Sequence, residues 1–414
     1  MSNSKNLISL GVIQFSNAVL PLIIFPYVLI VVGPELYSKI ALSEALMFVI
    51  FTFVLYSFEV DGVSEIVYLG NQSGGKKLSM IFSKILITRL LILTIFTVLT
   101  TLLYLLLDDI FYILLLSWML FPLSYILQSS YLYQALEENH ILALFVFFSR
   151  FVAIILVFYF IKDPIDANLL PLIIGGVYLI ASILSFVYAL KRYKLSVHIL
   201  RVQEIKQSLY NGKEIFYGNV SVLLFRDLNV LILGFLAIGV TGVSAYSISE
   251  KIIKSLQAAI RPLNQFFFPK VIRSIKSFAT PNMGVLMIIG RSTVLQLLAL
   301  SFLVLLAFLI ASYRDEFSIL TGHQDFNLVY SLSAVMVFSV FIGVLNFMYG
   351  TIGLNHLNCK RYYANKILMT GLVSVSMSFL FVFVFKEYGA AYSFVISEFL
   401  LFIFVIKRYF NNAI

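Results

Sequence analysis

Charged residues are scarce in this chain of 414 residues, and their scarcity excludes a soluble protein. Charged side chains make up 12% of the sequence, hydrophobic ones make up 61%, and the mean hydropathy is +0.99. Soluble domains contain roughly 45 to 50% apolar and about 25% charged residues. The composition therefore predicts an integral membrane protein that crosses the bilayer many times.

Residues that form disulfides or ligate metals are equally few. The chain has one cysteine, Cys359, and four histidines that are scattered along it. This set gives neither an intrachain disulfide nor the spacing of a zinc site. We therefore expect no cofactor other than a coupling proton or sodium ion. The net charge of +9 is expected to reflect membrane topology, and it does not indicate a nucleic-acid partner.

Long apolar stretches follow one another along the whole chain. A transmembrane helix needs about 20 mostly apolar residues, and this length predicts about twelve spans. They fall near residues 9–32, 38–58, 82–107, 111–135, 141–161, 168–190, 214–237, 241–264, 285–312, 327–352, 362–385 and 388–407. The eighth carries Glu250, Lys251 and Lys254, so it fails a simple hydropathy test. We predict an all-α, polytopic membrane protein.

The longest polar connection divides these spans into two sets of six. It runs from Lys191 to Lys213 and is amphipathic enough to lie along the cytoplasmic surface. We predict an N-terminal half over 1–190, a linker over 191–213 and a C-terminal half over 214–414. Short loops rich in Lys and Arg mark the cytoplasmic side, which places both termini in the cytoplasm. Paired halves around a central cavity are typical of alternating-access transporters.

Several motifs in the second half point to one family. They are a Tyr-Ser pair (Tyr246, Ser247), a small-Glu-Lys triplet (Ser249, Glu250, Lys251), Pro262 and a Phe-Pro exit (Phe268, Pro269). The stretches FEVDGVSEIVYLG and KKLSMIFSKILITRLLIL add to them. With these motifs the chain resembles the bacterial Wzx-type flippases. They form the polysaccharide transporter branch of the multidrug/oligosaccharidyl-lipid/polysaccharide exporter superfamily.

This resemblance implies a cargo and a location. The cargo would be an undecaprenyl-diphosphate-linked oligosaccharide, such as an O-antigen repeat unit, moved from the cytoplasmic to the periplasmic leaflet of the bacterial inner membrane. The expected partners are this lipid-linked oligosaccharide, membrane lipid and other membrane proteins of polysaccharide assembly. A diphosphate requires cationic donors, and arginine suits it because its planar fork donates two hydrogen bonds at once.

Arg226 and Asp227 stand inside an otherwise apolar stretch and are the leading site candidates. A charge near the bilayer centre costs about 2.5 to 3.5 kcal/mol on insertion scales, so each of them needs a partner. Neighbouring helical residues point about 100° apart, so the two need separate partners. Arg226 is expected to contact the diphosphate or the glycan, and Asp227 to support Arg226 or to couple an ion. The alternative is an interhelical ion pair with a structural role.

Four other polar residues are candidates. Arg150, midway along the fifth span, is the second cationic candidate, and Glu398 in the last span is a candidate for proton or cation coupling. Gln14 and Asn17 stand in the first span, where related flippases often carry cationic residues. We assign both to substrate binding.

Charged residues nearer the cytoplasmic ends are expected to be structural. Arg89 and Arg291 can extend to the membrane surface, as long basic side chains do. The carboxylates Glu59, Asp61 and Glu65 match no metal-binding loop, and a solvated turn around Gly62 is expected there.

Two other functions stay open. An ion-coupled multidrug or organic-cation antiporter of the same superfamily would require a carboxylate-rich cavity. A membrane polysaccharide polymerase or ligase would require convergent titratable groups in a sizeable external loop. The external loops are short, so we expect a transporter and no enzymatic activity.

Overall fold

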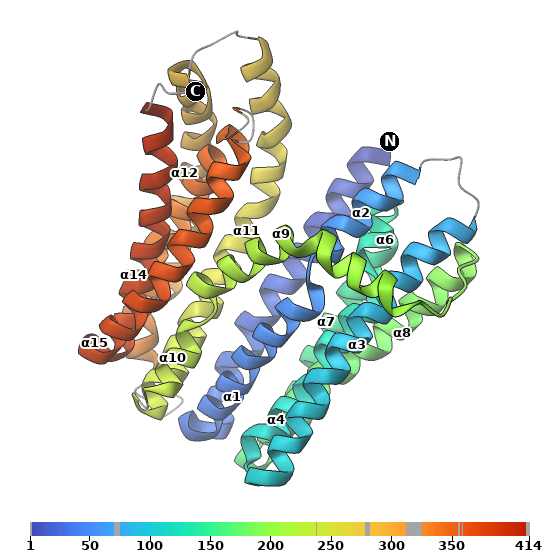
Figure 1. Ribbon diagram of the computed structural model, residues 1–414. Coiled ribbons are helices and arrows are strands. Elements are labelled where there is room, and N and C mark those ends of the chain that lie inside the picture. Colours follow the sequence, from blue (N-terminus) through green and yellow to red (C-terminus); the bar gives the residue numbers. More distant parts are fainter. Residues whose placement is uncertain are drawn as a thin grey trace. The chain divides into compact units, whose positions relative to one another are not determined.

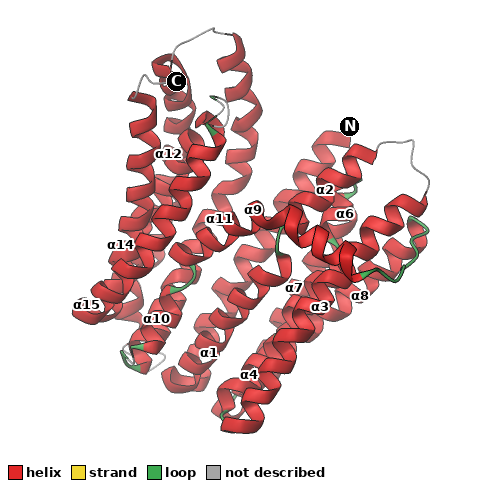
Figure 2. Ribbon diagram, viewed as in Figure 1, coloured by secondary structure: helices red, strands yellow, loops and turns green. Residues whose placement is uncertain are grey.

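The structure is a computed structural model that describes residues 2–69, 75–236, 238–277, 282–311, 325–354, 357 and 359–410. All regular structure in these residues is helical (Figure 2), as the composition predicts. Backbone amides cannot bond to water inside a bilayer, and a helix satisfies them internally. The segments between residues 312 and 324 and the Asn355–His356 pair lie outside the described residues.

The chain divides into two compact units, Met1–Val220 and Ser221–Ile414, and each is described here by itself. The helices of the first unit are α1 (Ser2–Leu55), α2 (Phe58–Leu69), α3 (Gly75–Leu107), α4 (Ile110–Trp118), α5 (Leu120–Gln128), α6 (Ser130–Ala135), α7 (Asn139–Phe160), the 3₁₀ helix η2 (Pro164–Asn168), α8 (Leu169–Arg192) and most of α9 (Val202–Arg226). Those of the second are the end of α9, α10 (Asn229–Phe235), α11 (Val240–Ser277), α12 (Asn282–Ala311), α14 (Asp325–Leu345), the π-helix η3 (Asn346–Leu354) and α15 (Lys360–Phe410).

Each unit is a bundle of long helices (Figure 1). In the first, α5 packs on α8, and α7 packs on both α1 and α8. In the second, α11 packs on α14, and α14 packs on α15. Small residues allow close approach, as at Gly175 of α8, where an added Cβ would lie 2.7 Å from the Cβ of Leu120.

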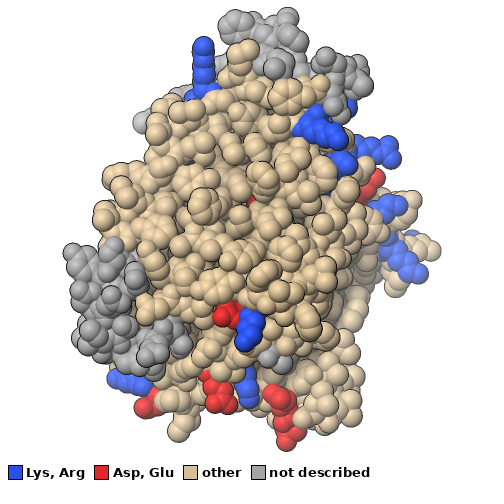
Figure 3. All heavy atoms as spheres, turned by 90° about the vertical axis from the view of Figure 1, so that its left-hand side faces the viewer, with Lys and Arg blue, Asp and Glu red and all other residues tan. Residues whose placement is uncertain are grey.

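Eight helices of the described residues are long and apolar enough to cross a membrane, or nine if the bent pair of α9 and α10 is one span. The helix α11 is not among them, because it carries Glu250, Lys251 and Lys254 as the sequence indicates. Figure 3 shows one face of the molecule, where most charged side chains lie toward the top, the bottom and the right-hand edge and surround a broad uncharged area. The chain is a multi-pass membrane protein, and the number of twelve spans stays a prediction.

The two longest helices each fold back on themselves. A helix of 51 residues, the length of α15, would be about 77 Å long if straight, against about 30 Å for the hydrocarbon core. The backbone of α15 breaks at Lys386 (φ 53°), and Ser378 and Ser393 on the two arms are joined by a hydrogen bond of 2.7 Å. In α1 the break is at Gly33 (φ 78°), where glycine is permitted. Both breaks fall between predicted spans.

The predicted linker is partly helical, and the carboxylate cluster differs from the sequence prediction. Residues 202–213 of the predicted linker belong to α9, and Gly212 closely approaches Ser57 in the turn between α1 and α2. The carboxylates around Gly62 belong to α2, so the expected solvated turn is wrong.

Two carboxylates of α2 form ion pairs with basic residues of α3. Lys84 lies 2.6 Å from Glu65, and Arg89 donates to Glu59 over 2.8 Å. Arg89 is 1% exposed, so it does not extend to the surface as expected, whereas Arg291 is exposed. The ion pair with Glu59 offsets part of the cost of burying the guanidinium, whose Nε and Nη1 form no hydrogen bond with the described residues.

The hairpin in α15 predicts a disulfide. Ser374 and Ser397 lie on opposite arms with their hydroxyl oxygens 2.7 Å apart, whereas a straight helix would separate the residues by about 34 Å. Replacing both serines by cysteine in a Cys359→Ser background should give a protein that oxidises to a disulfide-linked form, detected as a reductant-sensitive mobility shift. The pair Leu372→Cys and Phe399→Cys, on exposed positions, is the control; equal oxidation of both pairs would contradict the hairpin.

Candidate functional site

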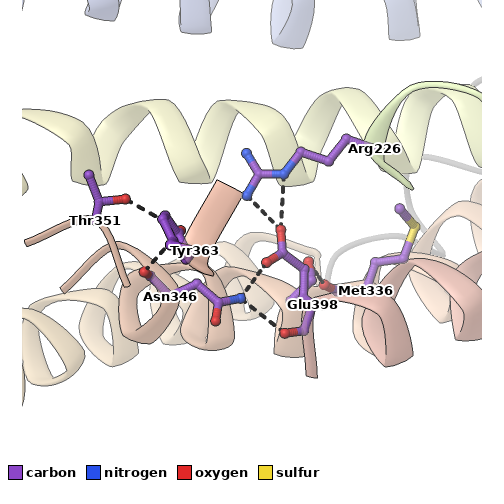
Figure 4. A network of polar contacts seen from close by, with 7 residues as sticks. Arg226, Met336, Asn346, Thr351, Tyr363 and Glu398 are labelled. Carbon is purple, nitrogen blue, oxygen red and sulfur yellow. Dashed lines mark hydrogen bonds and ion pairs between the residues drawn. The ribbon is translucent and has the colours of Figure 1, made fainter. Parts of the chain in front are cut away.

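Arg226 is the last residue of α9, at the point where the chain bends by 56° into α10. Its Nε and Nη2 atoms both donate to Oε1 of Glu398 on α15, over 3.0 Å and 2.6 Å. Figure 4 shows the guanidinium lying over the carboxylate. Nη1 has no hydrogen-bond partner among the described residues, so one edge of the guanidinium is held and the other is open.

Glu398 is fully buried and is held from two sides. Asn346, the first residue of η3, donates from Nδ2 to Oε2 over 2.8 Å and to the Glu398 carbonyl over 3.0 Å. The Tyr363 hydroxyl in turn donates to the Asn346 carbonyl over 3.4 Å (Figure 4). A buried carboxylate is tolerated when it is both paired and hydrogen-bonded, and this one is. A π-helical turn such as η3 is frequently found at functional sites.

A cavity of about 250 Å³ adjoins Arg226 inside the second unit. Its described lining comes from α9, α11, α14 and η3 and consists of Arg226, Gln257, Ile260, Asn264, Val340, Gly343, Val344 and Phe347. The Arg226 side chain is 29% exposed, which matches its place in the cavity wall. The described lining therefore combines one cation and two amides with an apolar wall.

Asp227 and Arg226 have separate partners, as their spacing predicts. Asp227 lies 2.5 Å from Nζ of Lys254 on α11, and Lys254 also lies 3.0 Å from Glu250 on its own helix. The carboxylate against Arg226 is thus Glu398, where the sequence suggested Asp227. Lys254 and Asp227 are 37% and 29% exposed, so this group is partly accessible.

The first unit brings two other predicted site residues together. Arg150 of α7 donates from Nε to Oδ1 of Asn17 on α1 over 3.0 Å, and from Nη1 to Ser149 over 2.9 Å. Its guanidinium carbon lies 3.5 Å from the ring centre of Tyr178 on α8. Arg150 is 5% exposed and Gln14 lies half-buried one turn before Asn17. Arg150 thus joins three helices, and its role in substrate binding stays a prediction.

Three amide side chains of this site, Asn346, Gln257 and Asn264, were not among the sequence predictions. Asn346 supports Glu398, while Gln257 and Asn264 line the cavity. The available signal was their position within apolar spans, with Gln257 and Asn264 spaced by two helical turns on one face. No group of three or more His, Cys, Asp or Glu residues that could hold a metal ion occurs in the part of the chain where placement is described.

The buried pair predicts an asymmetry between two variants. Arg226→Ala leaves Glu398 uncompensated and should destabilise the protein by about 3 to 5 kcal/mol. The double variant Arg226→Gln, Glu398→Gln removes both charges and should restore most of that loss. Thermal unfolding in detergent, followed by size-exclusion chromatography, measures both. If the single variant melts as the wild type does, the pair contributes nothing to stability.

Comparison with known proteins identifies the family of this chain. Residues 4–274 match the family model described as polysaccharide biosynthesis protein. A protein of Escherichia coli (strain K12) named "Putative O-antigen transporter" is 26% identical over 96% of this chain and 94% of its own length. A protein of the same name from Shigella dysenteriae is 24% identical over 64% of this chain and 67% of its own.

Solved structures agree on the fold. An inward-facing multidrug resistance MATE family transporter of the MOP superfamily superposes with a TM-score of 0.58 and 13% identity, over 98% of this chain and 94% of that one. Such low identity shows the fold alone. The family match and the fold together confirm the resemblance to the polysaccharide branch of the exporter superfamily. The chain belongs to the polysaccharide biosynthesis protein family and has the fold of the MOP-superfamily transporters.

Proposed function

We propose that this chain is a flippase that moves undecaprenyl-diphosphate-linked oligosaccharide from the cytoplasmic to the periplasmic leaflet by alternating access. It acts as a transporter in the bacterial inner membrane, with both termini in the cytoplasm. The observation that carries the proposal is the guanidinium of Arg226, which faces a polar cavity within a membrane-embedded bundle. The names of the two relatives, O-antigen transporters, support the same cargo class.

The chemistry of the proposed cargo matches the side chains that line the cavity at Arg226. The diphosphate and the sugars cannot cross hydrocarbon unaided, whereas the polyprenyl tail can stay in the lipid. Arg226 Nη1 offers a charged donor for the phosphate oxygens, and the amides of Gln257 and Asn264 offer hydrogen bonds to hydroxyls. An inside-negative membrane potential favours outward movement of an anion by about 2.3 kcal/mol per charge per 100 mV.

A coupling ion completes the cycle in this proposal. Glu398 is fully buried and engaged by Arg226 and Asn346, whereas Asp227 is 29% exposed and holds one lysine. Asp227 is therefore the better placed of the two predicted carboxylates to exchange a proton or a sodium ion.

The composition of the cavity also bears on the antiporter of organic cations. Such a protein would present carboxylates to its cargo, and the described lining of the cavity at Arg226 contains none. The only charged side chain in that lining is cationic. The positive charge of this side chain favours an anionic cargo.

A charge-neutral double variant tests the role of Arg226 in transport. Arg226→Gln with Glu398→Gln keeps the site uncharged and folded but removes the donor for the diphosphate. In proteoliposomes, the rate at which lipid-linked oligosaccharide reaches the opposite leaflet should fall at least about tenfold, since a hydrogen bond to a charged group contributes about 1.5 to 3 kcal/mol. Arg226→Lys should retain part of the rate, because it keeps the charge but loses the fork.

The matched control removes another Arg–Glu pair. Arg89→Gln with Glu59→Gln takes away the pair between α3 and α2, whose residues are not in the described lining of the Arg226 cavity, and should leave the rate within about twofold of the wild type. Wild-type transport by the Arg226→Gln, Glu398→Gln variant would show that the pair only holds the helices together, and would remove Arg226 from the cargo site.

A further inference from the structure

A second cavity, of about 580 Å³, lies in the first unit between α2, α3 and the beginning of α9. Its described lining shares no residue with that of the cavity at Arg226. Four of its lining residues share one face of α3, because they follow one another at steps of one to three residues over two helical turns. They are Lys77, Met80, Ile81 and Lys84. The predicted third span begins near residue 82, so this cavity lies at the boundary of the membrane.

The segment that joins α8 to α9 is held on α3 by its backbone. The N–H groups of Ser196 and His198 donate to the hydroxyl oxygens of Ser79 and Ser83, over 3.1 Å and 2.9 Å. The next residue, Ile199, is 100% exposed. An isoleucine that is fully exposed on a backbone fixed at the membrane boundary is placed to enter the headgroup region of a lipid leaflet.

Exposed basic residues flank this segment in the sequence and begin the helix on which it lies. They are Lys76, Lys77, Lys194, Arg201 and Lys206. The one carboxylate between residues 191 and 206 is that of Glu204, which accepts a hydrogen bond from the Arg201 N–H over 2.8 Å at the start of α9. Clusters of lysine and arginine next to a membrane span attract anionic lipid. The charge of this surface therefore complements an anionic headgroup.

One lysine of the cavity lining is available to a ligand. Lys84 is engaged, because its Nζ bonds both carboxylate oxygens of Glu65 over 2.7 Å and 2.6 Å. Lys77 is exposed and forms no hydrogen bond or ion pair with the described residues. The same lining is apolar at Met80 and Leu200. An occupant with an anionic head and an apolar tail meets both features.

We propose that this cavity binds one anionic phospholipid of the surrounding bilayer. The phosphate lies at Lys77, and an acyl chain runs along Met80 and Leu200. Ile199 enters the headgroup region beside it. A zwitterionic phospholipid has the same chains without the net charge, and a free phosphate ester has the charge without the chains, so neither satisfies both halves of the site. This proposal does not depend on the proposed function.

Lipid titration of the delipidated full chain in detergent, followed by native mass spectrometry, tests the charged half of the site. The wild type should bind phosphatidylglycerol at least about fivefold more tightly than phosphatidylcholine with the same chains. Lys77→Gln should remove this preference and leave the affinity for phosphatidylcholine within about twofold. Lys162→Gln is the matched control, because Lys162 is also exposed but is absent from the described lining, and it should keep the preference. Equal binding of both lipids by the wild type would overturn the proposal, as would an equal loss in the control.

Competition and a second variant test the apolar half. Met80 is 47% exposed, so Met80→Gln does not disturb a packed core, and it should weaken binding of phosphatidylglycerol at least about threefold. Glycerol 3-phosphate, which has no acyl chains, should not displace phosphatidylglycerol from the wild type. Its displacement of the lipid at equal concentration would overturn the proposal in favour of a site for soluble phosphate esters. Tighter binding of undecaprenyl phosphate than of phosphatidylglycerol would overturn it in favour of a site for the carrier lipid.

Discussion

Charges placed within apolar helices must be compensated there, and the described polar interior follows from this constraint. Water is absent from the hydrocarbon core, so an uncompensated charge costs several kcal/mol. Arg226 meets the requirement through Glu398 on α15, and Lys254 meets it through Asp227. Arg150 meets it with the Asn17 amide and the Tyr178 ring. Each of these contacts joins different helices, so the charged residues also determine which helices contact one another.

The Arg226–Glu398 pair connects structure to transport because it leaves the guanidinium half engaged. Glu398 and Asn346 hold one edge in place, and the other edge faces the cavity. A preorganised donor of this kind needs no rearrangement when an anion arrives. An anion at Nη1 would share the guanidinium with Glu398, and this would weaken the contact between α9 and α15. Cargo binding and helix packing would then depend on the same group, as alternating access requires.

The sequence predicted the features that depend on local composition. It predicted the helical membrane fold, the breaks near Gly33 and Lys386, and the failure of α11 in a hydropathy test, because apolar runs and charges along one segment decide them. It also predicted that Arg226 and Asp227 need separate partners. It did not identify Glu398 as the partner of Arg226, which is 172 residues away, because tertiary packing selects such a contact. The amides of the cavity were missed although their spacing on one face of α11 is visible in the sequence.

The proposed cargo is an anionic lipid-linked sugar. The most direct measurement reconstitutes the purified wild-type chain in liposomes that contain lipid-linked oligosaccharide and an organic cation, and follows both across the bilayer. We expect protein-dependent appearance of the oligosaccharide at the opposite leaflet and no movement of the cation above that in protein-free liposomes. Efflux of the cation with no movement of the oligosaccharide would contradict it.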